Sequence, residues 1–208
     1  MKTILPLFLL CVGCVTFMTG CASSGVRNPS GTPVTELKPD EAGTVRGTGV
    51  ESQDLVSVTD KMVRSILNVK QIANATTPPL IVLESVRNDT RFPINRNIFL
   101  TRISGQLMSK AQGKVLFLAR DRWETLQKER ELKRQGQVTA SSDPTVQEFK
   151  GADYFLTGSL QGISTRTGAG TSDYVLYNFH LIDARTSAII WEDMAEVKKQ
   201  GLQDAAYR

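Results

Sequence analysis

Residues with reactive side chains are few and unevenly placed in this chain. It has 208 residues, three cysteines (Cys11, Cys14 and Cys21, all in the first tenth) and a single histidine, His180. Zinc sites need several Cys and His ligands close together, so this distribution excludes the ordinary types. It also argues against nucleophilic mechanisms that use a cysteine or a histidine-activated serine. Carboxylate chemistry and oxygen-ligated cations remain open at this point.

The acidic side chains offer no convincing catalytic pair. Those of the last third fall at expected strand ends and turns, where acidic residues are common anyway; they are Asp153, Asp173, Asp183, Glu192 and Asp193. His180 lies within an expected strand, where a lone histidine is usually a half-exposed strand residue. The glycine-rich stretches at 47–49 and 165–171 lack the sequence of a phosphate-binding loop. We therefore expect no enzyme activity, no cofactor and no metal site.

The amino terminus has the pattern of a secretion signal. Lys2 precedes an apolar run from Ile4 to Met18, which is shorter than the roughly 20 residues of a transmembrane helix. Small residues then surround Cys21, and this stretch resembles a bacterial lipoprotein signal, in which the cysteine is acylated and becomes the first mature residue. We predict a signal peptide at 1–20 and lipidation of Cys21. Because Ala22, not aspartate, follows the cysteine, we expect the outer membrane, with the domain in the periplasm.

Composition divides the rest of the chain. Residues 21–51, the lipidated cysteine and a flexible tether, are rich in Ser, Gly, Thr and Pro. About thirty such residues average roughly 30 Å end to end and cannot exceed about 100 Å. We place a globular domain at 52–198 and a polar tail at 199–208. With 40% hydrophobic and 22% charged residues, the composition fits one ordinary domain.

Helices and strands alternate in the first half of the domain. Apolar residues recur at three- and four-residue spacing from Ser52 to Ala73, which indicates an amphipathic helix. Short β-branched or apolar runs predict buried strands. The expected elements are a helix over 52–73, a strand over 80–86, a turn over 87–90, a helix over 97–112 and a strand over 115–118. Their strand-helix-strand order favours parallel pairing with a right-handed crossover.

A strongly charged helix is expected next. Asp121 and Glu124 have capping-box spacing, and we expect Trp123 and Leu126 to face inward. The outward residues up to Arg134 alternate in sign and have a small net charge. They indicate a solvated helix face and not a nucleic-acid-binding surface. A loop over 136–142 and a short helix from Asp143 and Pro144 follow.

The last third has the alternation of an antiparallel sheet. We expect strands over 154–160, 174–182 and 188–192, with a hairpin tip at 165–171. Side chains of one face of the middle strand are apolar: Val175, Tyr177, Phe179 and Leu181. The predicted fold is α+β, a mixed sheet of about four to five strands flanked by about four helices.

Several of these stretches resemble the LpoB family of outer-membrane lipoproteins. The similar segments are Gly151-Ala152-Asp153-Tyr154-Phe155-Leu156-Thr157-Gly158-Ser159-Leu160-Gln161-Gly162, the strand over 177–183, Thr186-Ser187-Ala188-Ile189-Ile190-Trp191, and the strand end Val86-Arg87-Asn88-Asp89-Thr90. The resemblance implies a fold like the N-terminal domain of TolB. The family usually has Thr-Gly-Glu where this chain has Thr186-Ser187-Ala188, so Ser187 replaces a glycine at positive φ. The tether also looks shorter than in the best-known member.

The resemblance implies a function in cell-wall synthesis. The anchored domain would dock on a noncatalytic module of a bifunctional penicillin-binding protein, a peptidoglycan synthase, and raise its glycosyl-transfer and crosslinking activities. As a hypothesis, exposed basic residues near the strand joints, Arg166 and Arg185, form part of the docking face. We expect a monomer that does not bind nucleic acid.

An alternative is a CsgG-like secretion or assembly lipoprotein of the outer membrane, because that group shares related strand motifs. A pore subunit would need membrane-spanning hairpins with alternating apolar faces. No stretch between Gly162 and Tyr174 is long or apolar enough for such a hairpin. We therefore favour the activator.

Overall fold

The structure is a computed structural model in which residues 26–27, 33–43, 46–138 and 149–202 are described. The chain separates into two compact units, Met1–Leu37 and Lys38–Arg208. In the first unit, β1 (Val26–Arg27) and β2 (Pro33–Val34) pair antiparallel, with Val26 opposite Val34. The second unit contains the sheet and all the helices of the described residues. The signal peptide and Cys21 lie outside the described residues, as does the short helix expected from Asp143.

The second unit begins with helices and short parallel strands. Its first elements are α1 (Ser52–Leu67), α2 (Lys70–Ala73), β3 (Leu80–Leu83), β4 (Arg87–Asp89), α3 (Ile98–Lys110), β5 (Leu116–Phe117), a 3-10 turn (Arg120–Arg122) and α4 (Trp123–Arg134). The predicted parallel pairing of β3 with β5 is confirmed. The single helix predicted over 52–73 is interrupted at Asn68 and Val69, where the backbone leaves the helix.

Three long antiparallel strands complete the unit: β6 (Tyr154–Thr167), β7 (Gly170–Asp183) and β8 (Ile189–Gly201). The six-stranded sheet has the order β5-β3-β6-β7-β8, and β4 also pairs with β6. The predicted mixed sheet and α+β class are confirmed. The strands are longer than expected, because their polar outer portions still pair fully. β8 therefore reaches Gly201, beyond the residue at which we expected the domain to end.

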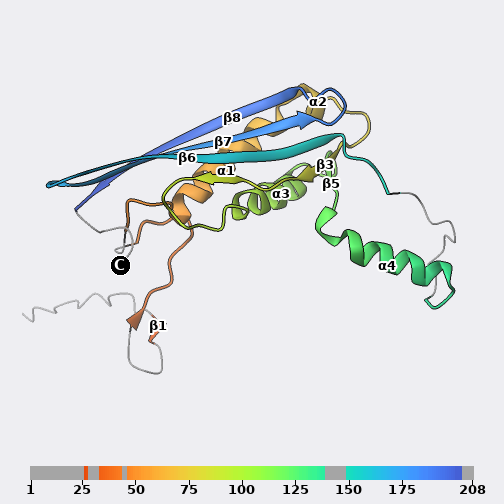
Figure 1. Ribbon diagram of the computed structural model, residues 1–208, viewed down its shortest axis with the longest axis horizontal. Helices are drawn as coiled ribbons and strands as arrows, with labels where there is room; N and C mark the ends of the chain where they lie inside the picture. Colours follow the sequence, from red (N-terminus) through yellow and green to blue (C-terminus); the bar gives the residue numbers. More distant parts are fainter. Residues whose placement is uncertain (1–25, 28–32, 44–45, 139–148, 203–208) are drawn as a thin grey trace, which may run out of the picture. The chain divides into compact units, whose positions relative to one another are not determined.

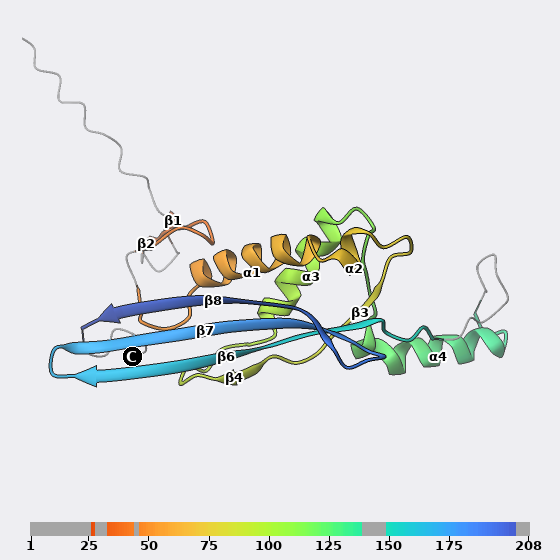
Figure 2. The same cartoon turned by 90° about the horizontal axis from the view of Figure 1, so that it is seen from above.

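Two expectations about local structure are wrong. Arg87–Thr90, expected to be a turn, contains β4, which pairs in parallel with Ser159–Gln161 of β6. Trp123 and Leu126 do not face inward: they are 40% and 41% exposed, and α4 has no buried residue and no capping box. Trp123 instead stacks on Phe149 with the ring centroids 3.9 Å apart. Figures 1 and 2 show α4 extending away from the sheet.

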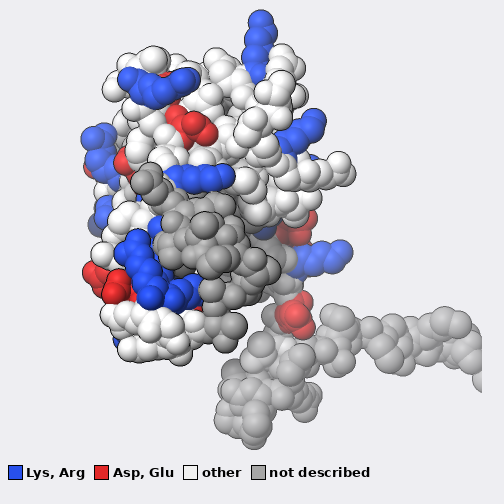
Figure 3. All heavy atoms as spheres, turned by 90° about the vertical axis from the view of Figure 1, so that its right-hand side faces the viewer, with Lys and Arg blue, Asp and Glu red and all other residues white. Residues whose placement is uncertain are grey.

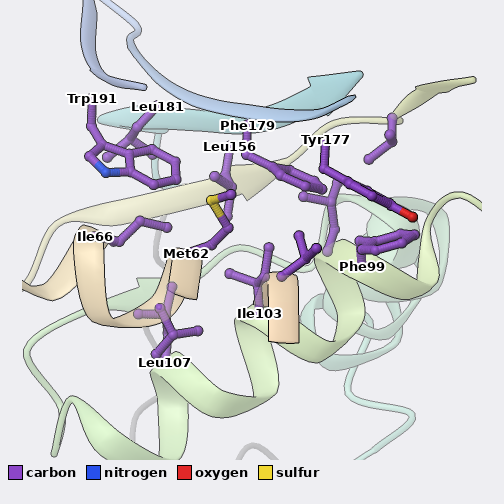
Figure 4. Close-up of a cluster of buried hydrophobic side chains, with 14 of the residues drawn as sticks. Met62, Ile66, Phe99, Ile103, Leu107, Leu156, Tyr177, Phe179, Leu181 and Trp191 are labelled. Carbon is purple, nitrogen blue, oxygen red and sulfur yellow. The ribbon is translucent and has the colours of Figure 1, made fainter. Parts of the chain in front are cut away.

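The core lies between the sheet and the helices α1 and α3, which cover one of its faces (Figure 1). Buried side chains of β7 alternate with half-buried ones, as the sequence predicts: Val175, Tyr177, Phe179 and Leu181 all point into the core. Phe99 of α3 lies against Tyr177 and Phe179, with ring centroids 5.4 and 6.0 Å apart. Figure 4 shows this cluster between strands and helices. The half-buried residues of β7, which alternate with the buried ones, lie on the opposite face of the sheet.

Candidate docking surface

The three long strands define two ends of the domain. At one end, which we call the hairpin end, β6 and β7 are joined by Gly168 and Ala169. This confirms the hairpin tip expected in 165–171. At the other, the turn end, residues 184–188 join β7 to β8. Any docking surface on the sheet has to be placed relative to these two ends.

Arg185 lies in the turn between β7 and β8. Its side chain is 82% exposed, and its Nη2 atom is 3.9 Å from Oδ2 of Asp183. The Oδ1 atom of Asp183 accepts hydrogen bonds from the backbone N–H groups of Thr186, at 3.0 Å, and Arg185, at 2.8 Å. These bonds to the charged carboxylate lower the pKa of Asp183. The turn that presents Arg185 is thus held by its own preceding aspartate.

The turn also contains a strained residue. Ser187 has a φ of 60°, at the position where the related family usually has glycine. Side chains with a Cβ pay roughly 1 kcal/mol in this left-handed region. We expect Ser187→Gly to raise the free energy of unfolding by about 0.5–1 kcal/mol, measured by urea denaturation. A destabilised Ser187→Gly variant would contradict this account of the turn.

Arg166 lies at the other end of the sheet, exposed in β6 and opposite Thr171 of β7. Thr171 and Asp183 are twelve positions apart in β7, which corresponds to about 40 Å along an extended strand. An interface of ordinary size covers about 800 Å² on each partner, a patch roughly 30 Å across. The structure therefore does not bring Arg166 and Arg185 together, and one ordinary interface does not include both.

The acidic residues considered for catalysis make structural contacts. Asp153 accepts a hydrogen bond from the Leu80 N–H at 2.8 Å, and Glu192 accepts one from Asn178 Nδ2 at 2.7 Å. Asp193 pairs with Lys61 at 3.2 Å. His180 is half-buried on the sheet face that α1 and α3 do not cover, as expected for a strand residue. Among the described residues, no group of three or more His, Cys, Asp or Glu side chains could hold a metal ion.

The hairpin end holds the end of the tether through Asp173. This carboxylate is almost fully buried and accepts two hydrogen bonds from Arg91, at 2.9 and 2.6 Å, and one from Ser164 at 2.5 Å. Arg91 also donates to Oγ1 of Thr48, a residue of the predicted tether that is only 4% exposed. The hydrogen bonds from Arg91 and then Ser164 lower the pKa of Asp173 to about 2.

A second ion pair holds the same segment. Lys199 Nζ lies 2.6 Å from Oδ2 of Asp54 and donates a hydrogen bond to the carbonyl of Gly49 at 2.8 Å. Gly49 is buried, and Gly47 donates its N–H to the side chain of Glu51. The chain therefore joins the domain at the hairpin end, with residues 47–50 packed onto it.

The buried Asp173 gives stability a defined pH dependence. Its folded pKa is lower than the value of about 4 in an unfolded chain, so its contribution is present above pH 4 and is lost as the pH falls towards 2. The shift corresponds to a contribution on the order of 2 kcal/mol. We expect Asp173→Asn to lower the free energy of unfolding by about that amount at pH 6 and by little near pH 2. Equal differences at both pH values, measured by urea denaturation, would rule out this role.

A groove lies at the ends of β3 and β5, beside the start of α3. Its volume is about 460 Å³, with Leu83, Leu100 and Phe117 in its lining. The charged lining residues Glu84, Arg120 and Asp121 are of both signs, and Arg120 already donates to the carbonyl of Lys150 at 2.8 Å. The groove lining therefore favours neither an anionic nor a cationic ligand.

The face of the sheet opposite the helices has apolar residues at the turn end. Phe155, Ile182 and Ile189 are aligned across β6, β7 and β8, and Val82 of β3 extends the row. Ile189 is 55% exposed. No local sequence pattern marks this row, because its members become neighbours only through strand register. None of the helices in the described residues is both long and apolar enough to cross a membrane.

Comparison with known proteins identifies the family. Residues 54–197 match the model of the family described as peptidoglycan-synthase activator LpoB. Among solved structures, the LpoB C-terminal domain from Salmonella enterica is similar, with 18% identity and a TM-score of 0.42 over 70% of this chain and 99% of that one. The corresponding Escherichia coli domain has 17% sequence identity and a TM-score of 0.39, over 70% of this chain and 99% of that one.

The solution structure of E. coli LpoB gives 14% identity and a TM-score of 0.39 over 96% of both chains. No curated protein sequence matches the chain. In the described residues, the family match spans the helices from the third residue of α1 onward and the whole six-stranded sheet except the end of β8. The chain therefore belongs to the LpoB family of peptidoglycan-synthase activators.

Proposed function

We propose that this protein is an outer-membrane lipoprotein that binds a bifunctional penicillin-binding protein from the periplasm and activates its synthesis of peptidoglycan. The observation that carries the proposal is the match of residues 54–197, nearly the whole sheet-and-helix unit, to the activator family. The acidic residues Asp153, Asp173, Asp183, Glu192 and Asp193 hold the fold together, which supports a binding protein and not an enzyme.

Attachment to the membrane is the second part of the proposal. Cys21, preceded by the apolar run 4–18, is the residue that we propose is acylated. Each buried CH₂ group contributes about 0.8 kcal/mol, so an anchor with several acyl chains holds stably. The polar segment that follows then leads to the domain, which it joins at residues 47–50.

Activation in this proposal is a coupling between binding of the domain and the equilibrium of the synthase between its resting and active forms. The domain needs to bind the active form of the synthase more tightly than the resting form. A coupling free energy of about 1–3 kcal/mol shifts the ratio of active to resting synthase roughly 5- to 150-fold, and no group on the activator has to enter the synthase active sites. Arg166 and Arg185 remain proposed docking residues, but they lie at opposite ends of the sheet.

The proposal is tested by adding the purified full chain, in detergent, to each bifunctional synthase of the same organism and following glycan polymerisation. We expect a several-fold higher rate with one synthase and no effect on an unrelated glycosyltransferase. A chain that stimulates none of the synthases would contradict the proposal. The family match does not favour the CsgG-like alternative. Only a ring-sized oligomer of the chain after detergent extraction would support that alternative.

A further inference from the structure

We propose that the turn end of the domain, opposite the tether, is the surface that binds the synthase, and that it recognises an acidic protein surface around an apolar centre. This inference rests on the proposed function and specifies where the partner binds. Four observations carry it: the position of the tether, the apolar row, the basic residues around that row and the polar character of the hairpin end.

The tether is fixed at the hairpin end. Thr48 and Gly49 are buried there by contacts with Arg91 and Lys199, and Lys199 is opposite Asp173 in the strand register. Because the tether enters the domain at the hairpin end, the turn end can lie farther from the anchored residue than the hairpin end does. The difference is up to the length of β7, about 40 Å. Binding through the turn end therefore adds the length of the domain to the reach of a short tether.

The apolar row provides the centre of an interface. Phe155, Ile182 and Ile189 are side by side on the sheet face that α1 and α3 leave uncovered. Phe155 and Ile182 are half-buried, and Ile189 is largely exposed. Protein interfaces commonly have a desolvated apolar centre with aromatic residues and a polar rim. At this end of the sheet the centre is already formed.

Basic side chains from several loops lie around the same end. The exposed basic residues at the turn end are Lys70 at the start of α2, Lys114 before β5, Lys150 before β6 and Arg185 after β7. Asp153 and Asp183 also lie there, but both accept hydrogen bonds from backbone N–H groups. In Figure 3, which faces this side of the molecule, patches of Lys and Arg are spread over the visible surface and are more extensive than those of Asp and Glu, which are also present. Such a surface favours an acidic partner and speeds association with it.

The hairpin end lacks an aligned apolar row of this kind. Its exposed residues include Thr165, Arg166, Thr167, Gly168 and Ala169, and Leu202, 80% exposed, follows the end of β8 there. Ile163, 67% exposed, has no apolar cross-strand neighbour of similar exposure: Tyr174 opposite it is half-buried, and Lys198 follows on β8. This end therefore supplies control positions: Ile163 lies on the same face of β6 as Phe155, and Arg166 is an exposed arginine three positions further along that strand.

The test compares charge and polarity changes at the two ends. Full-length variants in detergent are assayed for binding to the immobilised synthase and for stimulation of glycan polymerisation. Ile189→Asp and Arg185→Glu change the turn end; Ile163→Asp and Arg166→Glu are the matched controls at the hairpin end. We expect each turn-end variant to bind at least 10-fold more weakly and each control to stay within 2-fold of the unchanged chain.

Two measurements exclude simple misfolding. Urea denaturation checks that each variant unfolds like the unchanged chain, and Arg185→Ala, which adds no charge beside Asp183, should show a smaller loss in the same direction. Raising the salt concentration should weaken binding of the unchanged chain more than that of Arg185→Glu. The absence of this difference would contradict the electrostatic part of the proposal.

The outcomes separate the docking surface from the function. If the hairpin-end variants lose binding and the turn-end variants keep it, or if all four variants bind like the unchanged chain, the turn end is not the docking surface although activation still occurs. If the unchanged chain neither binds nor stimulates any synthase, the proposed function itself is wrong.

Discussion

Replacing Gly158 by alanine is expected to lower the free energy of unfolding by about 3 kcal/mol. Gly158 lies in β6 directly opposite Phe179 of β7. A Cβ atom at Gly158 would lie 2.5 Å from Cδ1 of Phe179 and 2.6 Å from the backbone oxygen of Asn178. Neither neighbour can move easily, because Phe179 packs on Phe99 and the Asn178 carbonyl belongs to a paired strand.

The expected loss of stability in Gly158→Ala is opposite to what the backbone preference for alanine over glycine predicts. Alanine in a strand is usually better than glycine, because glycine loses more conformational freedom on folding. Gly105→Ala is the matched control: Gly105 is exposed in α3 with no atom within 4 Å of its added Cβ, and that change should raise stability by about 1 kcal/mol. Urea denaturation, monitored by circular dichroism, measures the free energy of unfolding of both variants, and we expect their m-values to be unchanged.

A double variant locates the clash. Phe179→Leu combined with Gly158→Ala should recover only part of the lost stability, because the Asn178 carbonyl still lies in the way. A Gly158→Ala chain within 1 kcal/mol of the unchanged protein would mean that β6 and β7 do not approach as closely as described. Because Phe155 and Ile182 lie on the same two strands, such a result would also weaken the placement of the proposed docking surface.

The alternation in β7 explains why much of the sheet could be predicted. Val175, Tyr177, Phe179 and Leu181 alternate with more polar residues, and this period of two assigns a strand and its buried face together. The charged β4 gives no such signal. Arg87, Asn88 and Asp89 have the composition of a turn, and only their pairing with β6 makes them a strand. Tertiary pairing also extends β6 and β8 through polar residues.

Contacts between distant residues explain what the sequence did not reveal about the site. The pair of Arg91 and Asp173 joins residues 82 positions apart and buries Thr48 of the expected tether. No local pattern marks such a pair. The separation of Arg166 from Arg185, in contrast, follows from topology, because two consecutive antiparallel connections turn at opposite ends of their shared strand. The order of the strands alone was therefore enough to separate these residues.

Loss of the lipid anchor is expected to weaken activation in cells while leaving the purified protein fully active. In the proposed function, Cys21 holds the chain at the outer membrane and the domain acts only by binding. Replacing residues 1–21 with the signal peptide of a soluble periplasmic protein would give a chain that starts at Ala22 and has no acyl groups. We expect this chain to leave the membrane fraction entirely, because the acyl chains contribute about 0.8 kcal/mol per buried CH₂.

The matched control for this swap is the unchanged chain produced at the same level, with its amino-terminal peptide examined by mass spectrometry for acyl groups on Cys21. In solution, both chains should stimulate the synthase equally in detergent, because the docking surface that we propose lies at the end of the domain away from the tether. In cells, the unanchored chain loses the raised local concentration that a tether provides, so weaker activation is expected. An unmodified Cys21 in the unchanged chain, or a swapped chain that stays with the membrane, would show that anchoring does not depend on this cysteine.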